Sequence, residues 1–133
     1  MVMWRWCGVR NQLPVVEITV VNEEHDLWKY KSLRGKYEVH VDYAYPVKDQ
    51  LKSKGFKFHP VAKWWSKIVD EQELRSLLPF FETFTPHILI NDHLKAVNPD
   101  WKRKYPLLAE IEERYSDPMV VGRILKQIKA AKQ

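Results

Sequence analysis

The chain has 133 residues, of which 45% are hydrophobic and 13% aromatic, and its formal net charge is +5. This length fits one domain, and this apolar content excludes a disordered tail because it is sufficient to build a core. The four glycines match neither the P-loop nor the dinucleotide fingerprint, which argues against a glycine-rich phosphate loop.

The N-terminal stretch MVMWRWCGVRN has no continuous apolar region and no small-residue cleavage site, so we expect no signal peptide and a cytoplasmic protein. No apolar run approaches the roughly 18 to 20 residues that span a bilayer, so we expect no membrane partner. Cys7 is the single cysteine, so an intramolecular disulfide is excluded. We expect Cys7 to be a small apolar residue near the start of a strand. Trp4 and Trp6 alternate with Arg5, and we expect both indoles to pack inward; an exposed pair would mark a dimer or partner surface.

Two N-terminal segments have strand patterns. LPVVEITVV, at 13–21, is rich in β-branched residues. KYEVHVDY, at 36–43, alternates, so Tyr37, Val39, Val41 and Tyr43 are expected on one face and Glu38, His40 and Asp42 on the other. This alternation predicts a sheet with one buried face and one solvated face.

The next segment, YPVKDQLKSKG, predicts a short helix, with Pro46 in its first turn and Gly55 just past its end. FKF and KWWSKIV then predict two short strands joined by HPVA. Lys63, Trp65 and Lys67 are expected to share one strand face. Because Trp64 and Trp65 are adjacent in a strand, they should point to opposite faces, and at most one should enter the main core.

The C-terminal half predicts helices. DEQELRSLLPFF has an N-cap at Asp70, and Pro79 is expected to end or kink the helix. TPHILI is extended, NDHLKAV predicts a short helix, and Pro106 and Pro118 each open a further helix. We therefore predict one α+β domain over 1–133, with a small antiparallel or mixed sheet. Its parts are N-terminal strands over 1–43, a β-α-β-β-α module over 36–83 and a helical part over 91–133.

Positive charge is concentrated in the middle of the chain. Residues 28–67 contain ten basic and three acidic residues, a net charge of +7, whereas the remainder of the chain has a net charge of −2. A basic segment between nearly neutral ends favours a local contact with a polyanion, although a solvated lysine face is the simpler alternative.

The stretch YPVKDQLKSKGFKFHPVAKWW resembles, over about residues 36–69, a short module appended to helicase-, primase- and mobilisation-type proteins of plasmids, phages and archaea. In that module a lysine-bearing helix precedes glycine, an aromatic or small residue, a basic residue, tryptophan, Asp-Pro, two variable residues, lysine, one variable residue and tryptophan. The positions that fit are Gly55, Phe56, Lys57, Pro60, Lys63 and Trp65. Phe58 stands in place of the tryptophan and His59 in place of the acid. The resemblance implies a local βαββ fold, contact with nucleic acid and an origin in a virus or mobile element; it implies no reaction.

We therefore expect a nucleic-acid-binding accessory protein without catalytic activity or cofactor, which binds DNA or RNA through a lysine-rich, aromatic hairpin. Lysines would contact phosphates, and an exposed ring would stack on unpaired bases. The candidate residues are Lys48, Lys52, Lys54, Lys57, Phe58, Lys63, Trp65 and Lys67.

Two alternatives remain open at this point. One is a small protein-interaction factor that uses the aromatic surface without nucleic acid and that could form a homo-oligomer such as a dimer. The other is a metal-dependent nuclease built on His40 and Asp42, with Asp92 or His93 contributed from elsewhere. Nothing in their spacing brings these residues together, and a solvated sheet face explains them equally well.

Overall fold

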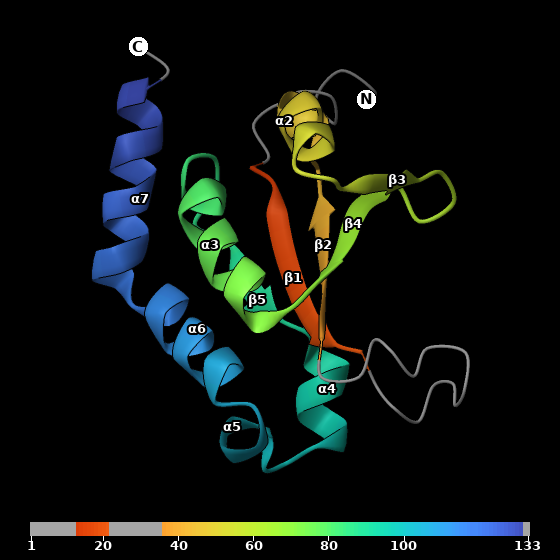
Figure 1. Ribbon diagram of the computed structural model, residues 1–133. Coiled ribbons are helices and arrows are strands. Elements are labelled where there is room, and N and C mark those ends of the chain that lie inside the picture. The colour runs from red at the N-terminus through yellow and green to blue at the C-terminus, as the bar shows by residue number, and fades with distance from the viewer. Residues whose placement is uncertain (1–12, 22–35, 132–133) are drawn as a thin grey trace, which may run out of the picture.

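The computed structural model describes residues 13–21 and 36–131. The predictions made for Trp4, Trp6 and Cys7 lie outside these residues. The described chain confirms the α+β class, with helices concentrated in its C-terminal half (Figure 1). None of the described helices has the length and apolar character needed to cross a membrane.

The described strands form one mixed sheet of five strands in the order β3-β4-β2-β1-β5. β1 pairs antiparallel with β2 and parallel with β5, and β4 pairs antiparallel with both β2 and β3. The bounds are β1 Val15–Val20, β2 Tyr37–Asp42, β3 Lys57–His59, β4 Trp64–Val69 and β5 Ile88–Ile90.

The alternation predicted for β2 is present, and register extends it across the sheet. Val39 and Val41 are fully buried, and Val41 lies opposite Val16 of β1. On the other side of β2, Val41 lies opposite Trp65, and His40 lies opposite Ser66. One face of the sheet therefore carries the core, and the opposite face carries the polar residues of β2.

Tyr43 departs from the prediction. Alternation placed it on the buried face, but β2 ends at Asp42, and Tyr43 has a φ of 54° and is largely exposed. A positive φ breaks the strand geometry, so the side chain does not follow the two-residue repeat. The chain then enters a short 3₁₀ turn, η2 (Tyr45–Val47), and helix α2 (Lys48–Ser53).

The central β-α-β-β-α order is confirmed by β2, α2, β3, β4 and α3 (Glu71–Glu82). Pro46 lies in the first turn of η2, and Gly55, with a φ of 92°, follows the end of α2. Asp70 caps α3, since its Oδ1 accepts a hydrogen bond from the backbone N of Glu73 at 2.8 Å. Each boundary uses a residue whose backbone preference matches it.

Of the two outcomes predicted at Pro79, an end or a kink, the end is wrong, because α3 continues through Pro79 to Glu82. Phe81 is fully buried and packs against Phe56, Phe80 and Phe84. A helix-interior proline removes one backbone hydrogen bond. Burial of the phenyl ring of Phe81 favours the helical turn that follows the proline.

The remaining helices are α4 (Asp92–Val97), α5 (Trp101–Lys104), α6 (Pro106–Ser116) and α7 (Pro118–Ala131). In Figure 1, α3, α6 and α7 gather on one side of the sheet, and the β3–β4 hairpin projects on the other side. α2 lies beyond the end of β2, and α4 lies at the opposite end of the sheet. The hairpin and the segment from β2 to α2 are thus placed at the same end of the sheet, away from the helical layer.

Candidate functional site

An open groove of about 610 Å³ lies at this end of the sheet. It combines side chains from the end of β2, the turn that follows, the start of α2 and the hairpin. The lining residues are Asp42, Tyr43, Ala44, Tyr45, Lys48, Phe58, Lys63 and Trp65. Four of the eight candidate residues predicted from the sequence therefore lie together here, namely Lys48, Phe58, Lys63 and Trp65.

The hairpin contributes one wall of the groove. Phe58 and Trp65 are cross-strand neighbours, with ring centroids 5.4 Å apart at an interplanar angle of 49°. Trp65 is half-buried and packs against the core, which holds its ring in place. Lys63 closes the turn with a φ of 65°, and its backbone N donates to the His59 carbonyl at 2.7 Å.

The segment from Tyr43 to Lys48 contributes the other wall. Among the described residues, the large aromatic side chains that are exposed are Tyr43 at 55%, Tyr45 at 77% and Phe58 at 45%. All three line the groove. Exposed aromatic side chains gathered in one hollow are typical of ligand-binding surfaces, because a protein without a partner for them would tend to bury them in its core.

The charged residues that line the groove are Lys48, Lys63 and Asp42, and strand alternation directs the Asp42 side chain toward the sheet face that carries His40. Lys48 Nζ lies 4.5 Å from the centroid of the Tyr45 ring, a cation–π contact. Within residues 13–21 and 36–131, neither Lys48 nor Lys63 pairs with an acidic side chain. Burial raises the pKa of Asp42, as does the nearby Glu17, and His40 acts in the opposite direction.

The other four predicted site residues lie outside the groove. Lys52 is exposed on α2, and Lys54 Nζ lies 5.2 Å from the centroid of the Phe80 ring. Lys57 pairs with Ser66 in register, so alternation directs it to the face of the sheet opposite Trp65. Lys67 Nζ donates to the Lys54 carbonyl at 2.7 Å and pairs with the Glu73 carboxylate. Lys67 thus joins α2, β4 and α3 and is not a free cation.

The opposite face of β4 has its own aromatic contact. Trp64 stacks on His40 with centroids 4.2 Å apart and planes 14° apart, so the two adjacent tryptophans do point to opposite faces. Both are half-buried. His59 Nε2 lies 2.7 Å from Ser66 Oγ, a hydrogen bond that ties β3 to β4 on this face.

The residues of the nuclease alternative are not brought together. Asp42 lies opposite Val15 at the start of β1, whereas Asn91, which precedes Asp92, donates its backbone N to the carbonyl of Ile18 near the other end. In the part of the chain that the structure describes, no three histidine, cysteine or carboxylate side chains are placed to hold a metal ion.

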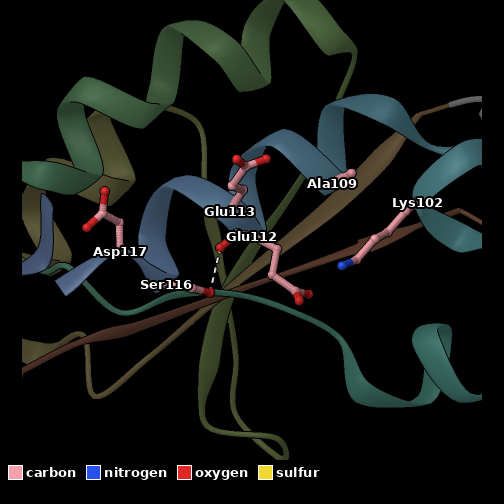
Figure 2. A pocket seen from close by; sticks show the side chains of 6 residues that line it. All are labelled: Lys102, Ala109, Glu112, Glu113, Ser116 and Asp117. Carbon is pink, nitrogen blue, oxygen red and sulfur yellow. Dashed lines mark hydrogen bonds between the residues drawn. The ribbon is translucent and has the colours of Figure 1, made fainter. Parts of the chain in front are cut away.

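A second hollow, of about 360 Å³, lies along α6 and contains three carboxylates (Figure 2). Three of its polar residues, Glu112, Ser116 and Asp117, form hydrogen bonds or ion pairs within the fold. Glu112 pairs with Lys95 at 3.2 Å, and its carbonyl accepts the Ser116 hydroxyl at 2.6 Å. Asp117 Oδ1 accepts from the backbone N of Met119 at the start of α7. Lys102 also lines this hollow, with its Nζ 5.8 Å from the centroid of the Trp101 ring, but none of the described residues that line it is aromatic.

Sequence reasoning missed Tyr43 and Tyr45 as site residues. The signal available was the local sequence DYAYP, in which a proline follows shortly after the strand and two tyrosines flank a small residue. Proline disfavours a continuing strand, so it indicated that the rings would leave the sheet. Comparisons of the chain with protein-family models, with curated proteins and with solved structures gave no match.

Proposed function

We propose that the protein is a nucleic-acid-binding accessory factor that holds a single-stranded segment of DNA or RNA in the groove at the end of the sheet. The observation that carries this proposal is the gathering of all three exposed large aromatic side chains of the described residues in one groove with two unpaired lysines. Rings of this kind stack on unpaired bases, and lysines contact the phosphates between them.

Backbone geometry supports the same site. Among the described residues, the positive φ angles outside glycine belong to Tyr43 and Lys63, and both residues line the groove. A non-glycine residue in this conformation costs of order 1–3 kcal/mol, and such residues cluster at ligand sites. The strain directs one ring and one ammonium group into the same concave surface from two different elements.

Unpaired bases suit this groove better than a duplex. Four rings line it, and a duplex would keep its base faces stacked within the helix and unavailable to them. The lysines are few, so the phosphate contribution should be modest and the rings should supply much of the affinity.

The test is fluorescence anisotropy with labelled 12-nucleotide single strands of dT and rU, titrated at about 50 mM salt. We expect Tyr45→Ala and Phe58→Ala each to weaken binding by about 5- to 150-fold, the range that corresponds to loss of one stacked ring. Leu89→Ala is the matched control, because Leu89 is an exposed apolar residue on β5, at the sheet edge opposite β3.

Equal affinity of wild type, Tyr45→Ala and Phe58→Ala for these strands would overturn the proposal. Absence of any binding at this salt concentration would also overturn it, and would favour the protein-interaction alternative. Tighter binding to duplex than to single strands would contradict the stacking role of the rings.

A further inference from the structure

The two walls of the groove come from separate segments of the chain, and one side chain joins these segments. Lys67 follows Trp65 by two residues on β4, so alternation places both side chains on the same face of the strand. Its Nζ donates to the carbonyl of Lys54, the C-cap residue of α2, at 2.7 Å. Within the described chain, no other side-chain hydrogen bond or ion pair links residues 43–54 to residues 57–69.

The ammonium group of Lys67 is held from a third element as well. It pairs with the Glu73 carboxylate of α3, and the Lys67 side chain is 25% exposed, so solvent screens this pair less than a fully exposed one. Gly55 leaves room for the ammonium group, since a Cβ at this position would lie 3.1 Å from Nζ. The glycine therefore lets Lys67 approach the end of α2, and α3 keeps it there.

Apolar packing alone does not fix the orientation of α2. Val47 and Leu51 are buried in the core and hold this segment against the sheet. Burial of apolar surface is non-directional, whereas a hydrogen bond is confined to a narrow range of distance and angle. Lys48, at the start of α2, lines the groove with its Nζ over the Tyr45 ring. A rotation of α2 would thus move an ammonium group and a ring of one wall relative to the hairpin.

We infer that Lys67 is a positioning residue, which sets the arrangement of the two groove walls and does not contact the ligand. This inference rests on the proposed function. The sequence predicted a phosphate contact for Lys67, but the Lys54 carbonyl and the Glu73 carboxylate occupy its ammonium group. The inference also assigns a role to Glu73: an acidic residue that does not line the groove supports the binding of a polyanion.

The experiment measures the affinity of the 133-residue chain and its variants for the labelled 12-nucleotide dT strand by fluorescence anisotropy. Lys67→Met keeps an unbranched side chain but loses both bonds, and we expect about 3- to 30-fold weaker binding, in the range of couplings between residues in contact. The slope of log K against log salt should stay that of wild type, because no phosphate contact is lost.

Lys57→Met is the matched control for this variant. It makes the same charge change on the same hairpin, at an exposed lysine that alternation directs to the opposite face of the sheet. It should bind almost as tightly as wild type. An equal loss of affinity in Lys57→Met and Lys67→Met would overturn the inference, because it would assign the effect to charge.

Glu73→Ala separates positioning from charge by the sign of its effect. If only the electrostatic field mattered, removal of this carboxylate would strengthen the binding of a polyanion. Because Glu73 holds Lys67 in place, we expect binding to weaken by about threefold or more. The variant keeps the backbone N–H that Asp70 caps. Glu113→Ala, the same charge change at an exposed residue of α6, is the matched control and should not weaken binding.

Wild-type affinity in both Lys67→Met and Glu73→Ala would overturn the inference and leave the proposed function standing, provided that Phe58→Ala still weakens binding. Tighter binding by Glu73→Ala, or a reduced salt slope in Lys67→Met, would also overturn it. Circular dichroism establishes that each variant is folded, and if Lys67→Met is not, the sign of the Glu73→Ala effect decides. Absence of binding by the wild type would remove the proposed function and this inference together.

Discussion

In the C-terminal helices, aromatic hydroxyls and charged side chains form hydrogen bonds and ion pairs, whereas at the groove the rings and lysines contact one another but form no side-chain hydrogen bond or ion pair with the described residues. Tyr115 is buried on α6, and its hydroxyl donates to the Glu82 carboxylate, which also accepts from Arg114 at 3.2 Å. Burial and this carboxylate raise the pKa of Tyr115. Tyr45, by contrast, is mostly exposed in the groove.

The difference separates residues that hold the fold from residues available to a ligand. Arg75 Nη1 lies 2.9 Å from Glu110 Oε2, so an ion pair joins α3 to α6. Lys63 has no such partner among the described residues. Substitutions in the helical region should therefore reduce stability, and substitutions in the groove should reduce binding with little effect on stability.

The largest expected effect contrasts two phenylalanines. Phe81→Ala should lower the free energy of unfolding by about 3 to 5 kcal/mol, because its fully buried ring leaves a cavity in the core. Phe58→Ala should lower it by less than about 1 kcal/mol, since the ring is already exposed at the groove. Urea denaturation followed by circular dichroism measures both. Comparable losses in the two variants would break the contrast between the regions.

A milder contrast uses two tyrosine hydroxyls. Tyr115→Phe removes the hydrogen bond to the Glu82 carboxylate and should cost about 1.5 to 3 kcal/mol of stability. Tyr45→Phe should leave stability unchanged, because its ring lies exposed in the groove. Thermal denaturation of both variants tests this. If the thermal midpoint of Tyr115→Phe were unchanged, the contact with Arg114 alone would be enough to satisfy the Glu82 carboxylate.

Two glycines should respond with opposite signs to the same substitution. Gly55→Ala should destabilise by about 1 to 2 kcal/mol, because its φ is 92° and the new Cβ would lie 3.1 Å from Lys67 Nζ. Gly122→Ala, in α7 with open space around it, should stabilise by about 0.8 to 1 kcal/mol. Chemical denaturation of the two variants measures both changes in the free energy of unfolding. An unchanged free energy of unfolding for Gly55→Ala would mean that the turn after α2 relaxes to accommodate the new Cβ.

The contribution of the groove lysines appears in the salt dependence of binding. Lys48→Gln and Lys63→Gln should each reduce the slope of log K against log salt by about 0.7, the value for one phosphate contact on a single strand. Lys126→Gln on α7 makes the same charge change at an exposed position far along the chain and should leave the slope unchanged. Equal reductions in all three variants would indicate a diffuse charge effect.

The smallest effect concerns pH and Asp42. Its folded-state pKa lies above the ordinary value of 3.8, so the folded protein holds this proton more tightly than the unfolded chain does. Stability is therefore lost as pH rises from that ordinary value through the raised folded pKa. Asp42→Asn should unfold at a higher temperature than wild type at neutral pH, and this gain should shrink as pH falls below 3.8. A gain that is independent of pH would exclude the titration of Asp42 as its cause.

Several features followed from the sequence alone because their causes are local. The cap at Asp70, the proline in the first turn of η2 and the glycine after α2 each depend on the backbone preference of one residue. The alternation that sends Trp64 and Trp65 to opposite faces depends only on strand geometry.

Tertiary structure alone decided which of these side chains share a site. Tyr43 leaves the sheet because its backbone has a positive φ. Lys67 is unavailable to a ligand because its ammonium group binds the Glu73 carboxylate of α3 and the Lys54 carbonyl at the end of α2. Charge and aromatic content indicated the whole basic segment as a candidate binding site and did not show which of its residues would lie together. The groove contains only the residues that the end of β2, the segment from Tyr43 to Lys48 and the hairpin bring together, because proximity in space depends on strand register and chain path and not on composition.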